Sequence, residues 1–481
     1  MQAKDLLAAS LLLVATCGGV IASCISQVAR SLLFVALLVG AVFVDRLDVE
    51  FGSLYWYRGS TRGFELTLLD ALAWSVLLGS LLVPRTRLPR WYWPAGIGLM
   101  GLFALYALAS VLTAEPAITG MFELSKIVRG LIVFAAAAAY VRSDRELGEM
   151  AFALATAVGI QAIFGLKQRY LGGMDRVAGT VDHANSLSMY LCLVTPVIAA
   201  AALADFPRWL RSWCWLAVGG GALALLLTVS RAGIPIFIVT VGGVVLWGMT
   251  WRVSAKKLGW IALAALVGAV IVRQSWDNIV ERYEQATLEQ EYFDKSTEGR
   301  GVYLRWAKAI LDEHPYGVGL NNWSYWVSRE HGPREGYYYE DYGDFSHPPP
   351  RESGDPGFHA APAHNLFALT AGELGYAGAT LFVLMWLRWL QLGSMFLWRR
   401  LTWPTHRLGA GIFFGTCGIF LQSMTEWVYR QTAIYFTFAV LLGTLASLTW
   451  MRRHVAPAFD VATASEGELE DAPEPAAAGR W

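Results

Sequence analysis

The stretch from Ala361 to Gly375, APAHNLFALTAGELG, places His364 and Asn365 directly before a hydrophobic segment and Glu373 further inside it. A neutral imidazole accepts a proton near pH 7, so His364 is a candidate for activating an attacking hydroxyl group. Both side chains could instead cap the helix, because a polar residue at a helix start satisfies free backbone N–H groups. Glu373 follows His364 by nine positions, about half a turn round the helix, so we expect it to form a structural ion pair instead.

A second group of candidates consists of basic residues at or near the ends of apolar segments. An arginine close to a hydrophobic segment is costly unless it is paired or faces water, and its planar fork fits phosphate oxygens. A bound anionic group explains these residues, although ion pairs with Glu123, Asp182 or Glu373, or contacts with lipid phosphates, would explain each one singly. The residues are Lys126, Arg129, Lys167, Arg169, Arg176, Arg231, Arg300 and Arg305.

The elements that carry these residues are predicted to be membrane helices. Of the 481 residues, 55% are hydrophobic and only 16% are charged, which is too apolar for a soluble domain of this length. A helix needs roughly 20 mostly apolar residues to cross a bilayer, and such runs recur along the chain. We predict an all-α polytopic protein with twelve or thirteen transmembrane helices, near residues 6–25, 29–45, 66–83, 95–113, 123–141, 146–166, 184–204, 209–229, 232–250, 257–273, 364–389, 408–424 and 431–450.

The short basic connections predict the orientation, since Lys and Arg collect in cytoplasmic loops. By this rule the connections at 84–90, 141–145, 207–211, 251–257, 398–407 and 451–454 lie inside, and those at 114–122, 167–183, 230, 274–363 and 425–430 lie outside. Thirteen spans with an inner C-terminus require an outer N-terminus. The N-terminus would instead lie inside if one of the first two hydrophobic segments is re-entrant, or if the chain has twelve spans.

The same pattern divides the chain into N-terminal transmembrane helices (1–119), a transmembrane core (120–273), a long periplasmic loop (274–363), C-terminal transmembrane helices (364–454) and a disordered acidic cytoplasmic tail (455–481). A loop of about ninety residues is usually functional. Residues 298–315 predict a helix that ends at Pro315, followed by a Gly-rich turn. The aromatic residues beyond this turn could line a sugar-binding surface or form an interface belt.

Four segments, in this order, resemble the O-antigen ligase and O-antigen polymerase superfamily of bacterial envelope glycosyltransferases. They are GTVDHANSLSMYL (179–191), TVSRAG (228–233), GRGVYLRWAKAILDEHPYGVGLNNW (299–323) and HNLFALTAGELGYAG (364–378). The resemblance covers roughly residues 120–450. It implies a GT-C type fold in the bacterial inner membrane, with the active site facing the periplasm.

The resemblance also implies an activity, which is the transfer of a glycan from undecaprenyl diphosphate to an acceptor hydroxyl. The acceptor is lipid A-core in a ligase, which is the function we expect first. It is a second carrier-linked polysaccharide chain in a polymerase, which is the alternative within the same superfamily.

Particular residues match the functional positions of the family. Its two diphosphate-binding arginines correspond to Arg231 and Arg300. Arg305 rivals Arg300, because the tryptophan that often follows the second arginine by four positions is replaced by Leu304. The essential histidine corresponds to His364. Further substrate-binding candidates are His183, Asn185, Lys126, Arg129 and Asn365, of which the first two flank Ala184 where the family often has Pro.

Transfer from a diphosphate-linked sugar requires a neutralised leaving group, an activated or oriented hydroxyl and in-line geometry. Two arginine forks meet the first need without a metal ion, and no carboxylate cluster with metal-binding spacing is obvious on the outer face. With the family resemblance, we expect an inverting, metal-independent enzyme without a cofactor. Its expected partners are the undecaprenyl diphosphate-linked glycan, the lipid A-core or polysaccharide acceptor, membrane lipids and envelope assembly proteins, with no nucleic acid.

A small-solute transporter is the main alternative from another class. Secondary transporters place ionisable residues and broken helices at mid-bilayer, often within inverted repeats. Here Asp70 and Glu373 are the notable acids within spans, no internal repeat is visible, and the polar groups gather at one face. This pattern favours chemistry on a lipid-linked substrate. A scaffold or flippase partner of an envelope assembly machine is a third interpretation.

Overall fold

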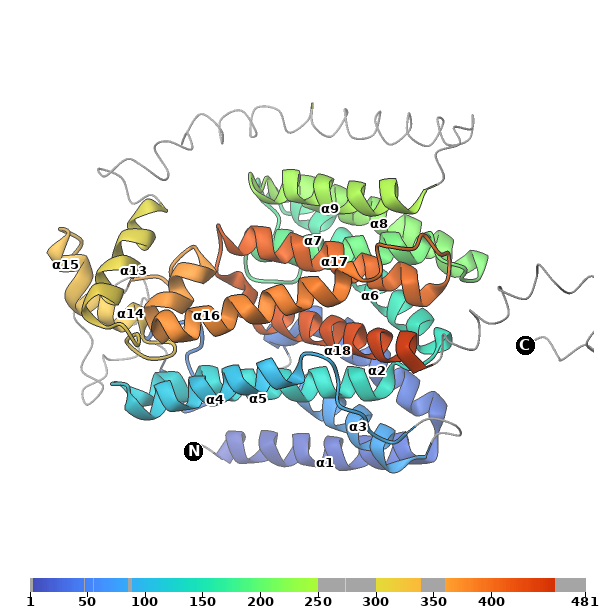
Figure 1. Cartoon of the computed structure of the whole chain (residues 1–481), viewed down its shortest axis with the longest axis horizontal. Coiled ribbons are helices and arrows are strands. Elements are labelled where there is room, and N and C mark those ends of the chain that lie inside the picture. The colour runs from blue at the N-terminus through green and yellow to red at the C-terminus, as the bar shows by residue number, and fades with distance from the viewer. Residues whose placement is uncertain are drawn as a thin grey trace, which may run out of the picture.

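The computed structural model describes residues 3–46, 48–54, 56–84, 89–249, 273, 300–338 and 360–454. Within these ranges, twelve helices of 14 or more residues lie side by side along the long dimension of the molecule (Figure 1). They are α1 (Ala3–Ile25), α2 (Gln27–Gly40), α3 (Leu68–Leu82), α4 (Ile97–Thr113), α5 (Ala117–Tyr140), α6 (Asp144–Leu166), α7 (Ala184–Ala202), α8 (Arg208–Thr228), α9 (Gly233–Gly248), α16 (Leu366–Ser394), α17 (Pro404–Ser423) and α18 (Thr432–His454).

These helices match twelve of the thirteen predicted spans. The other predicted span, near 257–273, lies outside the described residues except for residue 273, as do the loop segments 274–299 and 339–359 and the tail after residue 454. Seven of the described helices, namely α1, α2, α6, α7, α8, α16 and α18, are long and apolar enough to cross a membrane, and α3, α4 and α9 are shorter apolar helices. The prediction of an all-α polytopic membrane protein is confirmed.

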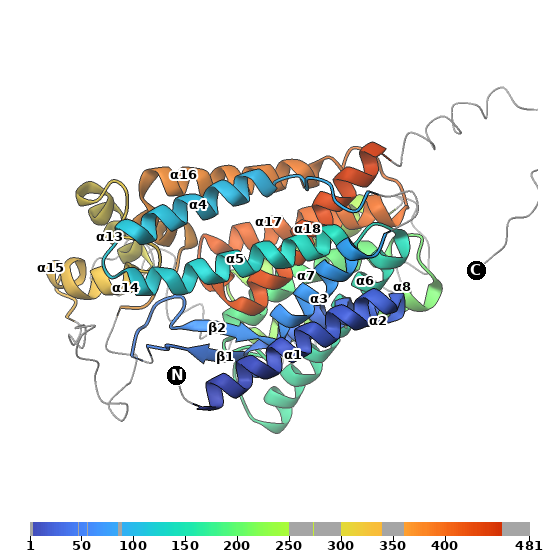
Figure 2. The ribbon, with the colours of Figure 1, turned by 90° about the horizontal axis from the view of Figure 1, so that it is seen from below.

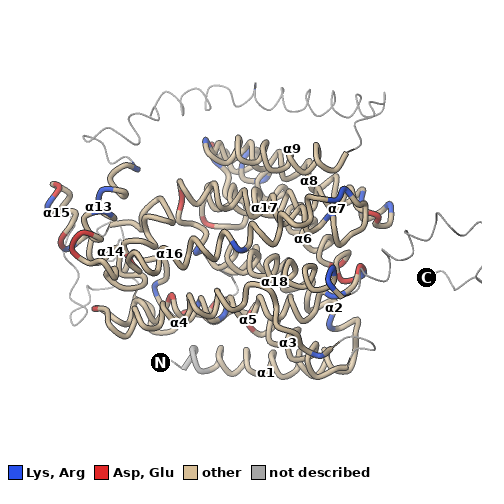
Figure 3. Tube along the Cα trace, in the orientation of Figure 1, with Lys and Arg blue, Asp and Glu red and all other residues tan. Residues whose placement is uncertain are grey.

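The two ends of the bundle differ. One end, called here the loop end, carries α13 (Gly301–Glu313), α14 (Trp323–Trp326), the single turn η3 (Val327–His331) and α15 (Gly332–Arg334). The opposite end, called the tail end, is where α18 stops. Helix α1 starts at the loop end, and α1 and α2 are separate helices (Figure 1). Charged residues gather toward the two ends and leave the middle of the bundle mostly uncharged, as membrane helices require (Figure 3).

A short β-hairpin at the loop end is absent from the sequence-based prediction. Strand β1 (Asp48–Phe51) pairs antiparallel with β2 (Phe64–Thr67), with Asp48 opposite Thr67 (Figure 2). Helix α3 starts directly after β2, and Thr67 and Asp70 form a capping box at its first turn. The predicted span at 66–83 therefore begins two residues later, and the hairpin holds its entry point.

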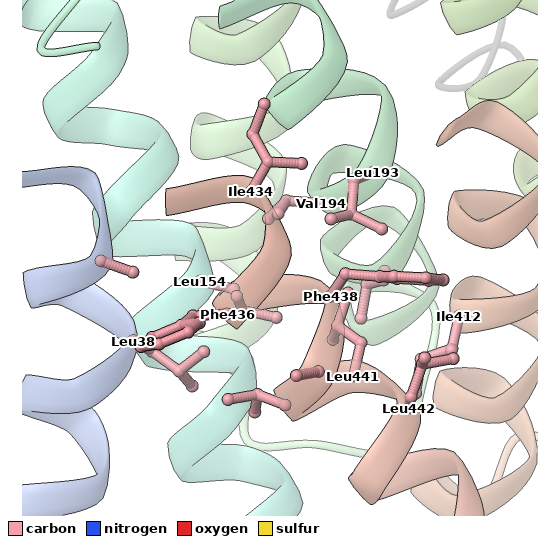
Figure 4. Close-up of a cluster of buried hydrophobic side chains, with 14 of the residues drawn as sticks. Leu38, Leu154, Leu193, Val194, Ile412, Ile434, Phe436, Phe438, Leu441 and Leu442 are labelled. Carbon is pink, nitrogen blue, oxygen red and sulfur yellow. The ribbon is translucent and has the colours of Figure 1, made fainter. Parts of the chain in front are cut away.

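Helices α7 and α18 form the centre of the bundle, and 94% of the apolar window of each is buried. Side chains from α2, α6, α7, α17 and α18 meet there, including Leu154, Leu193, Ile412, Phe436 and Phe438 (Figure 4). Helix α17 approaches α7 through glycine: a Cβ at Gly415 would lie 2.3 Å from the carbonyl oxygen of Leu193. Such close approach is typical of membrane helices.

A second, smaller core lies at the loop end. It joins α13 and α14 to the residues before α16 and to the first turns of α16, and it contains Val302, Trp306, Ala307, Ile310, Val318, Trp323, Val327, Ala360, Ala363, Ala368 and Leu369. The long loop is therefore packed onto the start of the helix that follows it.

Helix α16 is interrupted where the loop meets it. Gly375 has φ +66° and ψ −171°, a conformation almost confined to glycine. The Gly-rich turn after α13 fills the interruption, with Gly319 N–H donating to the Glu373 carbonyl at 2.8 Å and Tyr376 N–H donating to the Pro315 carbonyl at 3.0 Å. The residues before Gly375 are thereby hydrogen-bonded to the loop.

Candidate active site

The buried carboxylate of Glu426, in the connection between α17 and α18, holds several polar residues of the loop end together. Its side chain is 3% exposed. Oε1 accepts hydrogen bonds from Nη2 of Arg300 at 2.8 Å and from Nδ2 of Asn185 at 2.7 Å, and Oε2 lies 2.9 Å from Nδ1 of His364. A buried carboxylate needs partners of this kind, so the four side chains form one unit.

His364 faces this carboxylate and does not cap α16. The cap is Asn365, whose Oδ1 accepts from the Ala368 N–H at 2.9 Å. An ionised Glu426 selects the tautomer of His364 with the proton on Nδ1, which leaves the lone pair on Nε2. The imidazole side chain is 36% exposed and its ring centroid lies 5.6 Å from that of Tyr303. It is therefore accessible and oriented.

Of the two loop arginines considered for diphosphate binding, Arg300 is the one beside His364. It immediately precedes α13, and its guanidinium is 22% exposed while bound to Glu426. Arg305 instead pairs with Glu335 at 3.3 Å. The two arginines are five positions apart, which corresponds to about 140° around a helix, so their side chains reach different partners.

A further arginine enters the site from the segment before α7. Nη2 of Arg176 donates to Oδ1 of Asn185 at 3.0 Å, and its Nε donates to the carbonyl of Thr228 at 3.1 Å. His183 caps α7, with Nδ1 accepting from the Asn185 N–H at 3.2 Å. Asn185 thus links Arg176 to Glu426, whereas Nδ1 of His183 is engaged by the first turn of its own helix.

Arg231 lies on the turn between α8 and α9, three residues after Thr228. This turn packs tightly on α7, since a Cβ at Gly233 would lie 1.8 Å from Oγ of Ser188. Ser188 is about one helical turn beyond Asn185. The turn that carries Arg231 therefore borders the same part of the loop end as Asn185 and Arg176.

Lys126 and Arg129, the candidates on α5, face a separate charged cluster. Arg129 binds Asp70 through two contacts of 2.8 Å and Glu65 at 3.1 Å. Lys126 lies 3.5 Å from Glu65 and donates to the carbonyl of Arg430 at 3.1 Å. Their partners are thus Glu65 and Asp70, not the acids considered from the sequence.

Glu373 forms the ion pair within the bundle that its position predicts. Its Oε2 lies 2.6 Å from Nη1 of Arg430, and Nε of Arg430 lies 3.9 Å from Glu123. All three side chains are buried. Arg430 and Glu426 occupy the same short connection, so this connection serves both the structural ion pair and the candidate site.

A comparison with models of protein families matched part of the chain. The family model described as O-antigen ligase matches residues 214–383, about a third of the chain. This part of the chain is therefore similar to the O-antigen ligase family. The matched residues include Arg231, Arg300 and His364, which the sequence analysis selected. A search of curated proteins found no match.

The match, together with the apolar helices, supports a multi-pass membrane protein of the O-antigen ligase and polymerase type, a family that implies glycosyltransferase-like activity. Glu426 lies outside the matched residues, and the sequence analysis missed it. It follows His364 by 62 positions, and nothing local connects the two. The available signal was the presence of an acidic and a basic residue, Glu426 and Arg430, within one six-residue connection between apolar spans.

Proposed function

We propose that this protein transfers a glycan from undecaprenyl diphosphate to an acceptor hydroxyl at the loop end of the bundle, as an O-antigen ligase with lipid A-core as acceptor. A polymerase, in which the acceptor is a second carrier-linked chain, is the alternative. The observation that carries the proposal is the contact of both His364 and Arg300 with the buried Glu426. It joins a base for a hydroxyl group to a cation for a diphosphate.

The reaction is a single displacement at the anomeric carbon. Nε2 of His364 takes the proton of the acceptor hydroxyl, the acceptor oxygen forms the new bond to the anomeric carbon, and the bond from that carbon to the diphosphate oxygen breaks. The leaving diphosphate keeps the electron pair. Attack from the face opposite the leaving group inverts the anomeric configuration.

Glu426 supports this step through the tautomer of His364. Its Oε2 accepts the Nδ1–H of the ring, which fixes the ring and stabilises the imidazolium that forms when Nε2 gains the proton. The arrangement is similar in logic to other catalytic pairs of a carboxylate and an imidazole, in which the carboxylate orients the base.

Arginine side chains neutralise the leaving group in this proposal. Arg300 and Arg176 are both tied into the Glu426 unit, and Arg231 borders it. The planar, charged fork of arginine fits the oxygens of a diphosphate and can bind two of them at once. We therefore propose that the transfer step itself uses these cations in place of a metal ion.

The cellular location is part of the same proposal. The loop end would face the periplasm, with the protein in the bacterial inner membrane. Short connections at the tail end carry the Lys and Arg clusters of 141–145, 207–211 and 398–407, and such clusters mark the cytoplasmic side.

The test is an in vitro transfer assay with the full-length protein in detergent and a defined carrier-linked donor. His364→Ala should lower the rate by roughly a hundredfold or more, the usual range for loss of a general base. The matched control is His454→Ala, an exposed histidine at the tail end. If His364→Ala and the control transfer glycan equally well, the proposal fails. Offering lipid A-core and carrier-linked chains as competing acceptors separates ligase from polymerase.

A further inference from the structure

Two carboxylates and a histidine converge where the end of α13 meets η3. Glu313 is the last residue of α13, and Glu330 and His331 end η3. One ligand atom from each of the three side chains lies within 4.8 Å of the other two. This cluster is separate from the Glu426 unit, because Glu313 and Arg300 lie at opposite ends of α13, about 20 Å apart along the helix axis.

His331 sets this cluster apart from an ordinary group of surface acids. Its side chain is buried, with the residue 2% exposed, and neither ring nitrogen has a hydrogen-bond partner within the part of the chain that the structure describes. A buried polar group without a partner is rare and points to a bound ion or water.

We propose that Glu313, Glu330 and His331 form a binding site for a divalent transition-metal ion of the Zn²⁺ type. Imidazole nitrogen and carboxylate oxygen are both normal Zn²⁺ ligands, and three protein ligands leave the fourth position for water. Tetrahedral bonds of about 2.1 Å place ligand atoms roughly 3.4 Å apart. From separations of up to 4.8 Å, the ligand atoms must approach one another by up to about 1.4 Å, which the partly exposed side chains of the two glutamates allow.

Arg334 supplies the positive charge that balances the two glutamates in the structure, as a metal ion would. It forms ion pairs with Glu313 and, at 3.4 Å, with Glu330. Its side chain is 53% exposed, so it can turn into solvent when a dication binds. Exposed ion pairs of this kind are weak, so the metal ion has little to displace. The bound ion would fasten the end of α13 to η3.

The test is Zn²⁺ binding by the full-length protein in detergent after treatment with a chelator, followed by calorimetry. The wild type should bind one tight equivalent. His331→Asn and the double variant Glu313→Gln with Glu330→Gln should each weaken binding at least tenfold, about the smallest loss seen for partners even outside the ligand set. Glu313 is exposed and Glu330 is partly exposed, so both can be changed without disturbing the core around His331.

His454→Asn is the matched control, since it removes an exposed histidine at the tail end, and its Zn²⁺ affinity should equal that of the wild type. Co²⁺ provides an independent signal, because its visible absorption bands should appear in the wild type and vanish in His331→Asn. Absence of saturable Zn²⁺ binding by the wild type would overturn the proposal. Equal affinity in the double glutamate variant would also overturn it. Neither result depends on glycan transfer.

Discussion

At the scale of single residues, Glu426 defines what His364 can do. An imidazole beside a carboxylate has a fixed tautomer, whereas an imidazole in water exchanges its proton freely between the two nitrogens. The contact of 2.9 Å to Nδ1 makes Nε2 the basic atom. The same carboxylate neutralises Arg300, so loss of Glu426 would disturb both the base and the cation.

Glu426→Gln should therefore lower the turnover number by two to four orders of magnitude. Its amide can donate a hydrogen bond to Nδ1, which favours the unproductive tautomer of His364, and a comparable change in a serine protease costs about 10⁴. The measurement is kcat with a carrier-linked donor. Asp312→Asn, which changes an exposed carboxylate on α13 bound to Lys308, is the control. Retention of activity within threefold of the wild type would rule out the orienting role.

The variants Arg300→Ala and Arg305→Ala should differ clearly in activity. Arg300→Ala removes the guanidinium bound to Glu426 and should lower kcat/KM for the donor by roughly ten- to a hundredfold, the value of one or two charge-assisted hydrogen bonds. Arg305→Ala removes a partly exposed pair with Glu335 and should change kcat/KM less than threefold. The reverse order of effects would assign the diphosphate to Arg305.

At the scale of elements, a buried charged cluster joins β2, α3 and α5. Glu65 lies at its centre and also accepts a hydrogen bond from Thr432. Burial raises the pKa of Glu65, but Lys126, Thr432 and Arg129 outweigh this effect, so that its pKa falls below the ordinary value of 4.5. The folded state therefore prefers the ionised form of Glu65.

This preference sets the sign of an acid effect on stability. With a lowered pKa in the folded state, the stabilisation by Glu65 is complete above about pH 4.5 and disappears as the pH falls through the folded pKa. Glu65→Gln should destabilise the protein at pH 7 by on the order of 3 kcal/mol, because Lys126 and Arg129 lose a buried partner. Thermal unfolding in detergent should also show a smaller loss of stability between pH 5 and 3 in the variant than in the wild type. An equal loss in both would contradict the assignment.

Gly375→Ala tests the interruption in α16. A Cβ there would lie 2.3 Å from the Pro315 carbonyl oxygen, and the backbone conformation itself is strained for alanine, by about 1–3 kcal/mol. We expect a clear drop in the unfolding temperature. Gly98→Ala on α4 is the matched control, because a Cβ there meets nothing within 4 Å. It should leave stability unchanged or raise it, since alanine favours helix. Equal stability of the two variants would show that the turn does not constrain α16.

The helices were predictable from the sequence because each follows from a run of about 20 apolar residues. The hairpin was not, because four-residue strands such as DVEF and FELT carry too little periodicity to stand out. Arg231, Arg300 and His364 were selected through motifs, yet their arrangement depends on Glu426, which no motif contained. That Arg300 contacts Glu426 while Arg305 pairs with Glu335 could not be predicted either, because it depends on how α13 packs on α16.

At the scale of the whole molecule, the two ends of the bundle have different chemistry. The loop end combines the Glu426 unit with the hairpin, the second core and the cluster around Glu65. The tail end carries short basic connections. A lipid-linked substrate could meet all the reactive groups at one membrane surface, whereas a solute crossing the bilayer would need polar groups along the bundle.

Cysteine labelling in intact cells tests this polarity. Asp312→Cys, at the loop end, should react with a membrane-impermeant maleimide added outside once the outer membrane is made permeable. Arg399→Cys, at the tail end, should react only after the inner membrane is opened. The unsubstituted protein is the control for its five cysteines, of which two are buried. Labelling of Arg399→Cys before Asp312→Cys would reverse the proposed orientation.

The interruption at Gly375 also determines how this protein could be recombined with a relative. Before this glycine, Ala368 and Leu369 share a core with α13 and α14, and the carbonyls of Gly372 and Glu373 accept hydrogen bonds from the turn at 315–319. Beyond it, Phe382, Trp386 and Trp389 of α16 pack in the main core of the bundle. A chimaera that exchanged the loop but stopped at the start of α16 would cut through that core and displace His364. A graft that continues through Leu374 and joins at Gly375 would carry His364, the helix cap Asn365 and the second core in one continuous segment.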